Sequence, residues 1–137
     1  MIVVDANVLA AYAAGDSADI EALLVRDAVW IVPPIWLPEM RNILAKSIRA
    51  GRIELEQAMH ALTRVRKRVT TADRAISSRR VLELAIETRS SAYDCEYVAL
   101  AEMLYLKLVT ADRALAAKFP MIAVRLDEVA RGRIGDA

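Results

Sequence analysis

Short apolar runs alternate with helical patterns along this chain, and this alternation limits the available folds more than any other feature. The first run, Met1–Val4, ends at Asp5, and the second, Val29–Val32, is rich in β-branched residues and is stopped by two prolines. Further strands are expected at Leu108–Thr110 and Ile122–Val124. Strands that alternate with helices pair in parallel, so the sequence predicts an α/β fold, a three-layer sandwich around a mainly parallel sheet of about four to five short strands.

Helical patterns fill the intervals between these runs. The clearest covers residues 55–69, where apolar residues recur at three- and four-residue spacing. Each of the other expected helices is preceded by a residue that favours the start of a helix. These helices are expected to start from Asp16 or Ser17, Pro34, Ser77 or Ser78, and Ser91, and to end near Arg26, Ala50, Thr88 and Tyr105.

Length and composition narrow the class of protein. A chain of 137 residues suits one domain, expected over residues 1–137. Its longest uncharged stretches, 28–38 and 6–15, are far shorter than the roughly 18 residues of a membrane span, and Asp5 argues against a signal peptide. One cysteine and one histidine exclude an internal disulfide and a cysteine-based zinc site. We therefore expect a cytoplasmic protein without membrane contact.

Four carboxylates stand at positions where a ligand would gather. Asp5 directly follows the first expected strand, and Asp112 follows the third by two residues. In open parallel sheets, ligands bind at the carboxyl ends of the strands. Glu39 lies near the apolar face of its helix, and Asp94 begins an apolar stripe on another. A carboxylate in such a place needs a partner, because burial disfavours its charged form.

Carboxylates that converge on one crevice repel one another unless a positive charge compensates them. The neighbouring sequence offers no lysine at a fixed spacing and no histidine or cysteine ligand. An all-oxygen site suits Mg²⁺ or Mn²⁺, which activates a water for attack on phosphorus. Simpler roles stay open: Asp5 and Asp112 as helix caps, Asp94 as a capping partner of Ser91, and Glu39 as a first-turn acid.

Positive charge is concentrated in the middle of the chain. Residues 41–80 hold eleven Lys and Arg against three Asp and Glu, whereas the rest of the chain holds eight against fifteen. Because phosphate neutralisation dominates affinity for nucleic acid, part of this group is a candidate RNA contact, with solvated helix faces as the alternative. The candidates are Arg41, Lys46, Arg64, Arg66, Lys67 and Arg68.

Four segments carry a resemblance to a known family. They are Ile2–Leu9 (IVVDANVL), Pro34–Leu44 (PIWLPEMRNIL), Ser91–Ala101 (SAYDCEYVALA) and Leu108–Leu115 (LVTADRAL). In this order they resemble the PIN-domain ribonucleases, and most closely the VapC-type toxins of toxin–antitoxin pairs. The resemblance covers nearly the whole chain.

This resemblance implies a Mg²⁺- or Mn²⁺-dependent endoribonuclease that is inhibited by a bound VapB-type antitoxin and forms a homodimer. The residues that match the family's catalytic and metal-binding acids are Asp5, Glu39, Asp94 and Asp112. Asn7 and Thr110 match small polar neighbours that would orient the carboxylates. Ala114 stands where some PIN domains carry a further acid, so the site is expected to rely on four acids.

Two other functions stay open. A haloacid-dehalogenase-like phosphohydrolase would fit a similar sandwich, but it calls for Asp-x-Asp after the first strand, where this chain has Asp5-Ala6-Asn7. A non-catalytic PIN-like binding module would fit the same fold. Four idle carboxylates in one crevice argue against it, because their repulsion destabilises the fold.

Aromatic side chains are expected to fill the core. Trp30 and Trp36 bracket the double proline, and Tyr93 and Tyr97 flank Asp94. Base stacking is the alternative for the tyrosines, and a partner groove is the alternative for the tryptophans. If the toxin function holds, an antitoxin is expected to lay an apolar helix or strand across a groove near Trp36, with a basic side chain that reaches the acids.

Overall fold

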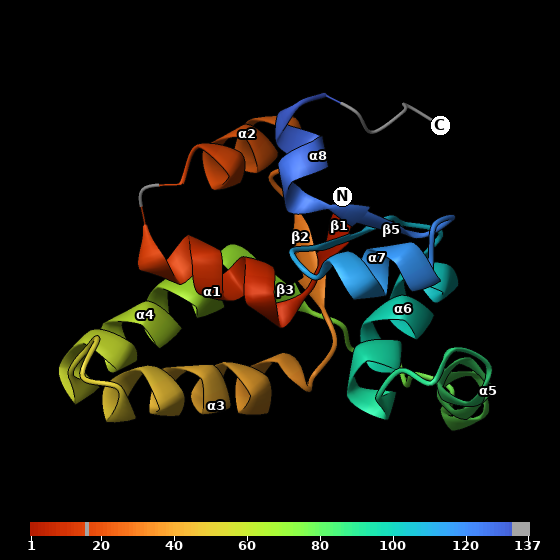
Figure 1. The fold of residues 1–137 in the computed structure, drawn as a ribbon, viewed down its shortest axis with the longest axis horizontal. Coiled ribbons are helices and arrows are strands. Elements are labelled where there is room, and N and C mark those ends of the chain that lie inside the picture. Colours follow the sequence, from red (N-terminus) through yellow and green to blue (C-terminus); the bar gives the residue numbers. More distant parts are fainter. Residues whose placement is uncertain (16, 133–137) are drawn as a thin grey trace.

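A parallel sheet of five strands forms the centre of the molecule (Figure 1). The computed structural model describes residues 1–15 and 17–132. Every pair of neighbouring strands is parallel, which confirms the predicted α/β class. In spatial order the strands are β3 (Val69–Thr71), β2 (Trp30–Val32), β1 (Ile2–Val4), β4 (Leu108–Thr110) and β5 (Ala123–Arg125).

The order of the strands reverses at β1. From β1 the chain builds outward to β2 and β3, and it then crosses back to place β4 and β5 on the other side of β1. The register pairs Val4 with Val109, and the Asp5 N–H continues the ladder with a 3.0 Å hydrogen bond to the Val109 carbonyl. In open α/β sheets, ligands bind in the crevice at such a reversal, outside the carboxyl ends of the strands.

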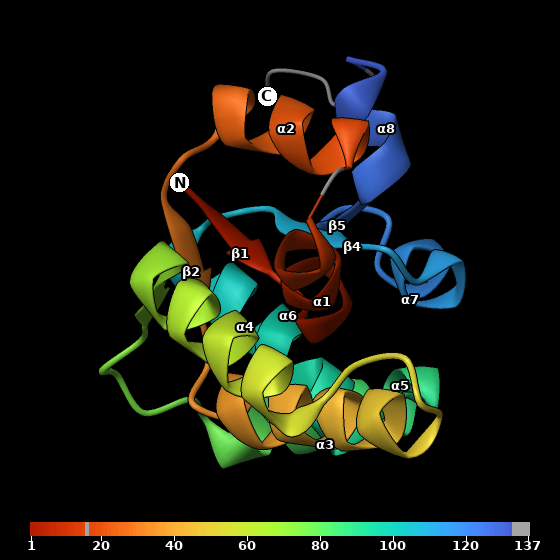
Figure 2. The same cartoon turned by 90° about the vertical axis from the view of Figure 1, so that its left-hand side faces the viewer.

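Helices cover both faces of this sheet (Figures 1 and 2). At one end of the molecule α2 packs against α8, and on the opposite side α5 packs against α6. Figure 2 shows α3 and α4 side by side, antiparallel, below α1. The helices are α1 (Ala6–Ala14), α2 (Ala18–Arg26), α3 (Trp36–Arg49), α4 (Leu55–Arg68), α5 (Ser78–Thr88), α6 (Ala92–Leu104), α7 (Arg113–Lys118) and α8 (Leu126–Ala130).

The two faces of the sheet bury separate apolar cores. Along β1, Ile2 and Val4 belong to the core that contains residues of α1 to α4 and α8, whereas Val3 belongs to the core of α5, α6 and α7. This alternation follows from the two-residue period of a strand that is buried on both faces. Ile43 of α3 packs against both cores. The predicted three-layer sandwich is therefore confirmed.

Two elements were not predicted from the sequence. The apolar stripe of the 55–69 helix includes Val69, but α4 ends at Arg68 and Val69 begins β3. The next two residues, Thr70 and Thr71, are exposed, so no alternating pattern marks this strand. The helix α8 has five residues, too few to show a helical period.

Serine hydroxyls cap three of the predicted helices. Ser17, Ser77 and Ser91 each accept a hydrogen bond from a backbone N–H in the first turn of α2, α5 and α6. Asp16, the alternative cap of α2, and residues 133–137 at the end of the predicted domain lie outside the described residues. None of the helices within the described ranges is long and apolar enough to cross a membrane.

Candidate active site

Two of the predicted acids flank the strand reversal. Asp5 directly follows β1, and Asp112 follows β4 by two residues. Each caps the helix that leaves its strand, Asp5 at α1 and Asp112 at α7. One oxygen of Asp112 accepts the N–H groups of Ala114 over 2.9 Å and Leu115 over 3.2 Å. The capping roles considered for these acids are thus real, and they place both carboxylates at the same edge of the sheet.

The buried carboxylate of Asp5 is held by three donors. Its Oδ1 accepts the Ala6 N–H over 2.8 Å. Its Oδ2 accepts the Thr110 hydroxyl over 2.8 Å and the Asn7 amide over 3.4 Å. Because both oxygens are engaged, Asn7 and Thr110 fix the orientation of this side chain.

Asn7 and Thr110 also tie the β4 loop to α1. The side-chain oxygen of Asn7 accepts the Ala111 N–H over 3.0 Å. The side-chain nitrogen of Asn7 donates to the Thr110 hydroxyl oxygen over 3.3 Å. The same oxygen of Thr110 accepts the Asp112 N–H over 3.0 Å. One hydrogen-bond network therefore connects Asp5 to Asp112 across the strand reversal and sets the placement of both.

Glu39 enters the site from α3. The double proline after β2 stops the strand, and Glu39 lies in the first turn of the helix that follows. Its Oε1 is buried and has no hydrogen-bond partner within the described residues. Burial raises the pKa of Glu39, and the nearby hydroxyl of Tyr97 on α6 lowers it.

The four acids influence one another electrostatically, so they lie in the same region of the fold. Burial raises the pKa of Asp5 to about 6, and the charges of Asp94 and Asp112 contribute to the rise. Burial also raises the pKa of Glu39, with contributions from Asp5 and Asp94. The pKa of Asp94 is raised by burial and by Asp112. The structure therefore brings together all four acids that the sequence analysis selected.

Two residues near the acids, Lys118 and Tyr97, were not predicted from the sequence to act on them. Asp94 lies in the first turn of α6, where the Ser91 hydroxyl accepts its N–H over 3.1 Å. Lys118, at the end of α7, lowers the pKa of Asp94. In the sequence this lysine is typical of a helix C-terminus, and nothing there links it to Asp94. Tyr97 belongs to the core, as predicted, and its spacing of three residues from Asp94 also puts it on the same side of the helix.

The donor set suits a hard divalent cation. All four side chains offer oxygen, burial and mutual repulsion raise the pKa values of three of them, and Glu39 Oε1 lacks a partner. As the side chains stand in residues 1–15 and 17–132, no three His, Cys, Asp or Glu residues converge closely enough to hold an ion. The residues fit Mg²⁺ or Mn²⁺ in their chemistry, and binding requires some of them to turn toward the ion.

Two of the candidate RNA contacts are engaged within the fold. Arg64 donates to the carbonyls of Ala13 over 3.1 Å and Tyr12 over 3.2 Å, and its guanidinium lies 5.5 Å from the centre of the Tyr12 ring. The guanidinium of Arg68 lies 5.9 Å from the centre of the Trp30 ring. Both side chains therefore join α4 to neighbouring elements.

The other candidates are exposed: Arg41, Lys46, Arg66 and Lys67. Lys46 comes seven residues after Glu39 and lies on the same side of α3. Arg41 comes two residues after Glu39 and faces another way; with Arg66 it lines a separate groove between α3 and α4. Of the two candidates on α3, Lys46 is the one directed to the side of the acids.

Core packing is confirmed for three of the four aromatic residues considered. Trp30 and Tyr97 are fully buried, Trp36 is 4% exposed, and the Trp36 indole N–H donates to the Thr71 hydroxyl over 3.0 Å. Tyr93, at 62% exposed, is not part of the core. The alternative that the tryptophan rings line a partner groove is wrong, because both rings are covered by the fold.

Known proteins match this chain in sequence and in fold. The model of the PIN domain family matches residues 2–118. No curated protein matches the sequence. Among solved structures, PAE2754 from Pyrobaculum aerophilum is 27% identical, with a TM-score of 0.78 over 96% of this chain and 95% of that chain.

Two more distant structures share the fold. A toxin–antitoxin complex from Klebsiella pneumoniae is 17% identical, with a TM-score of 0.64 over 92% of this chain and 98% of that chain. FitAcB from Neisseria gonorrhoeae is 16% identical, with a TM-score of 0.60 over the same shares of the two chains. The family model covers most of the chain and all four clustered acids. This chain belongs to the PIN domain family.

Proposed function

We propose that this chain is a metal-dependent endoribonuclease and the toxin of a VapBC-type toxin–antitoxin pair. PIN domains are generally nucleases. The observation that carries the proposal is the cluster of four acids at the strand reversal: Asp5, Glu39, Asp94 and Asp112. A cluster of carboxylates supports hydrolysis of phosphodiester bonds by water when a divalent metal is present.

In this proposal the four carboxylates hold Mg²⁺ or Mn²⁺. When bound, the ion lowers the pKa of a water and neutralises charge that develops at the phosphate. The hydrogen bonds from Thr110 and Asn7 keep Asp5 in one orientation, so its carboxylate needs no reordering. With a pKa of about 6, Asp5 is mostly ionised at neutral pH and is available as a ligand.

Exposed cations around the acids supply the RNA contacts in this proposal. Lys46 on α3 and Lys118 on α7 lie on the side of the acids, and Arg66 and Lys67 extend the positive surface along α4. Such contacts bind phosphates without reading sequence. Arg64 and Arg68, which serve the fold, are weaker candidates for this role.

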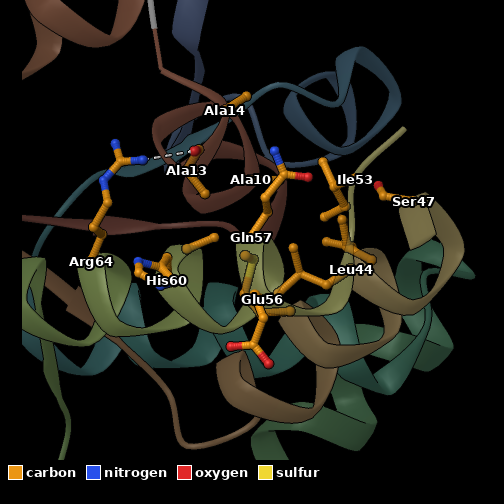
Figure 3. A pocket seen from close by; sticks show the side chains of 13 residues that line it. Ala10, Ala13, Ala14, Leu44, Ser47, Ile53, Glu56, Gln57, His60 and Arg64 are labelled. Carbon is orange, nitrogen blue, oxygen red and sulfur yellow. Dashed lines mark hydrogen bonds between the residues drawn. The ribbon is translucent and has the colours of Figure 1, made fainter. Parts of the chain in front are cut away.

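An apolar groove between α1, α3 and α4 is the proposed antitoxin site (Figure 3). Its volume is about 590 Å³. The apolar lining comes from Ala10, Ala13, Ala14, Met40, Ile43, Leu44, Ile53 and Ala61, and the polar lining from Ser47, Glu56, Gln57, His60 and Arg64. An amphipathic segment of an antitoxin could bury its apolar face here. The toxin–antitoxin complex of the similar Klebsiella protein supports a partner of this kind.

The groove and one of the acids, Glu39, share the helix α3. Met40 and Ile43 line the groove, and they lie one and four residues after Glu39. A basic side chain from the bound segment would reach the acids and displace the metal, because opposite charge compensates their repulsion. Reversal of charge by Glu39→Lys or Asp94→Lys should weaken the antitoxin complex, and an unaffected complex would contradict this placement.

We further propose a homodimer that works in the cytoplasm. The outer side of α5 exposes Leu82 at 56% and Ile86 at 79%, one helical turn apart. Association of two copies would remove this apolar pair from water. Sedimentation at several concentrations tests the dimer, and Leu82→Glu should yield a monomer.

The decisive experiment is cleavage of total cellular RNA by the purified chain with Mg²⁺, Mn²⁺ or EDTA. Asp94→Asn is the test variant, and Glu96→Gln is its control on the same helix, turned about 200° away. Defined fragments that require metal, persist in Glu96→Gln and vanish in Asp94→Asn would support the nuclease. Folded, antitoxin-free protein that cleaves no RNA would favour the non-catalytic binding module. Membership of the PIN family sets aside the haloacid-dehalogenase alternative.

A further inference from the structure

The hydroxyl of Tyr97 is buried without a hydrogen-bond partner among the described residues. Tyr97 is fully buried, and its ring packs in the core formed with α5, α6 and α7. An unbonded buried hydroxyl destabilises a fold, and phenylalanine would fill the same space without it. The fold alone therefore gives no reason for this hydroxyl.

Glu39 presents the complementary feature. Its Oε1 is likewise buried and without a partner among the residues that the structure describes. Beyond the effects of burial, the Tyr97 hydroxyl lowers the pKa of Glu39, and Glu39 raises the pKa of Tyr97. A donor on α6 and an acceptor on α3 thus both lack partners, and they lie close enough to change each other's pKa.

Tyr97 also faces the rest of the acid cluster. After burial and Glu39, the charges of Asp5 and Asp94 contribute to the raised pKa of Tyr97. Because Tyr97 lies three residues after Asp94, the two side chains leave α6 on the same side. The phenol stays protonated in these surroundings, so toward a carboxylate it acts as a donor.

Glu39 lacks the fixed donors that Asp5 and Asp112 have. Asp5 is fixed by three hydrogen bonds and Asp112 by two backbone N–H groups. Glu39 has a longer side chain with more rotamers to restrict, and its Oε1 has none of these contacts. Tyr97 is the neighbouring group that can restrict it.

We propose that Tyr97 is a positioning residue that donates a hydrogen bond to Oε1 of Glu39 and so keeps the other oxygen of that carboxylate available to the metal. The inference deepens the proposed function and rests on it. Tyr97 is covered by the fold, so it touches neither the cation nor RNA and acts through Glu39 alone.

The test uses the full chain and Mn²⁺ alone as the probe. Tyr97→Phe removes the hydroxyl and keeps the ring. Tyr12→Phe is the matched control, because the Tyr12 ring packs against Trp30 and Arg64. Calorimetric titration should show Mn²⁺ binding weakened on the order of tenfold in Tyr97→Phe and unchanged in Tyr12→Phe. Unfolding by urea in EDTA should show Tyr97→Phe folded and unfolding in one transition, with the modest loss of stability expected when Oε1 of Glu39 loses its donor.

A double-mutant cycle with Glu39→Gln tests whether Tyr97 affects Mn²⁺ binding through Glu39. If the phenol acts through Glu39, Tyr97→Phe causes no further loss of Mn²⁺ affinity in the Glu39→Gln background. Equal Mn²⁺ affinity in the wild type and Tyr97→Phe overturns the inference. So does a loss that persists beside Glu39→Gln, which would show that the hydroxyl acts by another route.

Cleavage of RNA, measured beside binding, separates this inference from the proposed function. A wild type that binds Mn²⁺ but cleaves no RNA refutes the nuclease, and the binding results still decide the role of Tyr97. A wild type that binds no Mn²⁺ overturns both.

Discussion

The hydroxyl of Thr110 donates a 2.8 Å hydrogen bond to Oδ2 of Asp5 across 105 residues of sequence. The same oxygen accepts the N–H of Asp112, so one buried hydroxyl contacts two acidic residues on neighbouring strand ends. Strand pairing between β1 and β4 brings these ends together. Thr110, the last residue of β4, therefore positions two of the four acids through one hydroxyl group.

Removal of the Thr110 hydroxyl should impair both stability and activity. Thr110→Val keeps the shape of the side chain but leaves Asp5 and the Asp112 N–H without this partner, which should lower the free energy of unfolding by about 1–3 kcal/mol. Metal-dependent RNA cleavage should fall about 10- to 100-fold. Urea unfolding and initial cleavage rates measure the two effects. Thr110→Ser, which keeps the hydroxyl, is the control, and a Val variant with the wild-type rate would contradict the role.

Stability of the metal-free protein should fall as pH rises from about 4 to 6. The pKa of Asp5 is about 6 in the fold, against 3.8 for the ordinary carboxyl. Between these values the unfolded chain has released a proton that the folded chain retains, so rising pH favours unfolding. The full effect, present above pH 6, is about 3 kcal/mol.

Asp5→Asn isolates this contribution. Urea unfolding in EDTA should show the wild type losing stability relative to Asp5→Asn between about pH 4 and pH 7. A constant difference between the two proteins over this range would show that Asp5 does not titrate there.

Divalent metal should stabilise the fold through the acid cluster. At a free concentration 100 times its dissociation constant, an ion that binds only the folded chain adds about 2.7 kcal/mol. Asp94→Asn should lose most of this gain, whereas Glu96→Gln should keep it. Urea unfolding with Mn²⁺ or EDTA measures the difference. Equal stabilisation of the wild type and Asp94→Asn would place the ion elsewhere.

The basic residues of α4 should separate into two groups. Arg64→Ala frees the carbonyls of Tyr12 and Ala13 and should lower the free energy of unfolding by about 1 kcal/mol, without changing the salt dependence of RNA binding. Arg66→Ala and Lys67→Ala should leave stability unchanged and reduce the slope of log affinity against log salt by about 0.7 for each phosphate that is no longer neutralised. Titrations at several salt concentrations distinguish the groups.

The end of α6 offers a stability test away from the site. Tyr105 follows this helix with φ at 56°, in the left-handed region, and its side chain is 95% exposed. Glycine adopts this conformation without the strain of a Cβ atom, so Tyr105→Gly should stabilise the fold by about 1 kcal/mol. Tyr105→Ala keeps the Cβ and should bring no such gain in urea unfolding.

The sequence predicted the fold where hydrophobic patterns are local. Two of the buried strands, β1 and β2, appear as apolar runs because both of their faces are covered. The edge strand β3 was missed, because Val69 continues the helical spacing of α4 and the following threonines are exposed. Only pairing with β2, a contact distant in sequence, makes this segment a strand.

The acids were predictable for a related reason. Asp5 and Asp112 stand at strand ends, and parallel strands bring such ends to one edge. Arg64 could not be assigned from the sequence, because its partners Ala13 and Tyr12 lie more than 50 residues away in the chain. Such a contact depends on how α1 and α4 pack, which no local pattern encodes.

The strand reversal at β1 also fixes when the site can exist during synthesis. Asp5 is synthesised 105 residues before its hydrogen-bond donor Thr110. At ordinary rates of translation this interval is about 5 to 20 s. During this interval the growing chain holds an incomplete acid cluster and no β4 to order it, so the cluster can assemble only after Thr110 has left the ribosome.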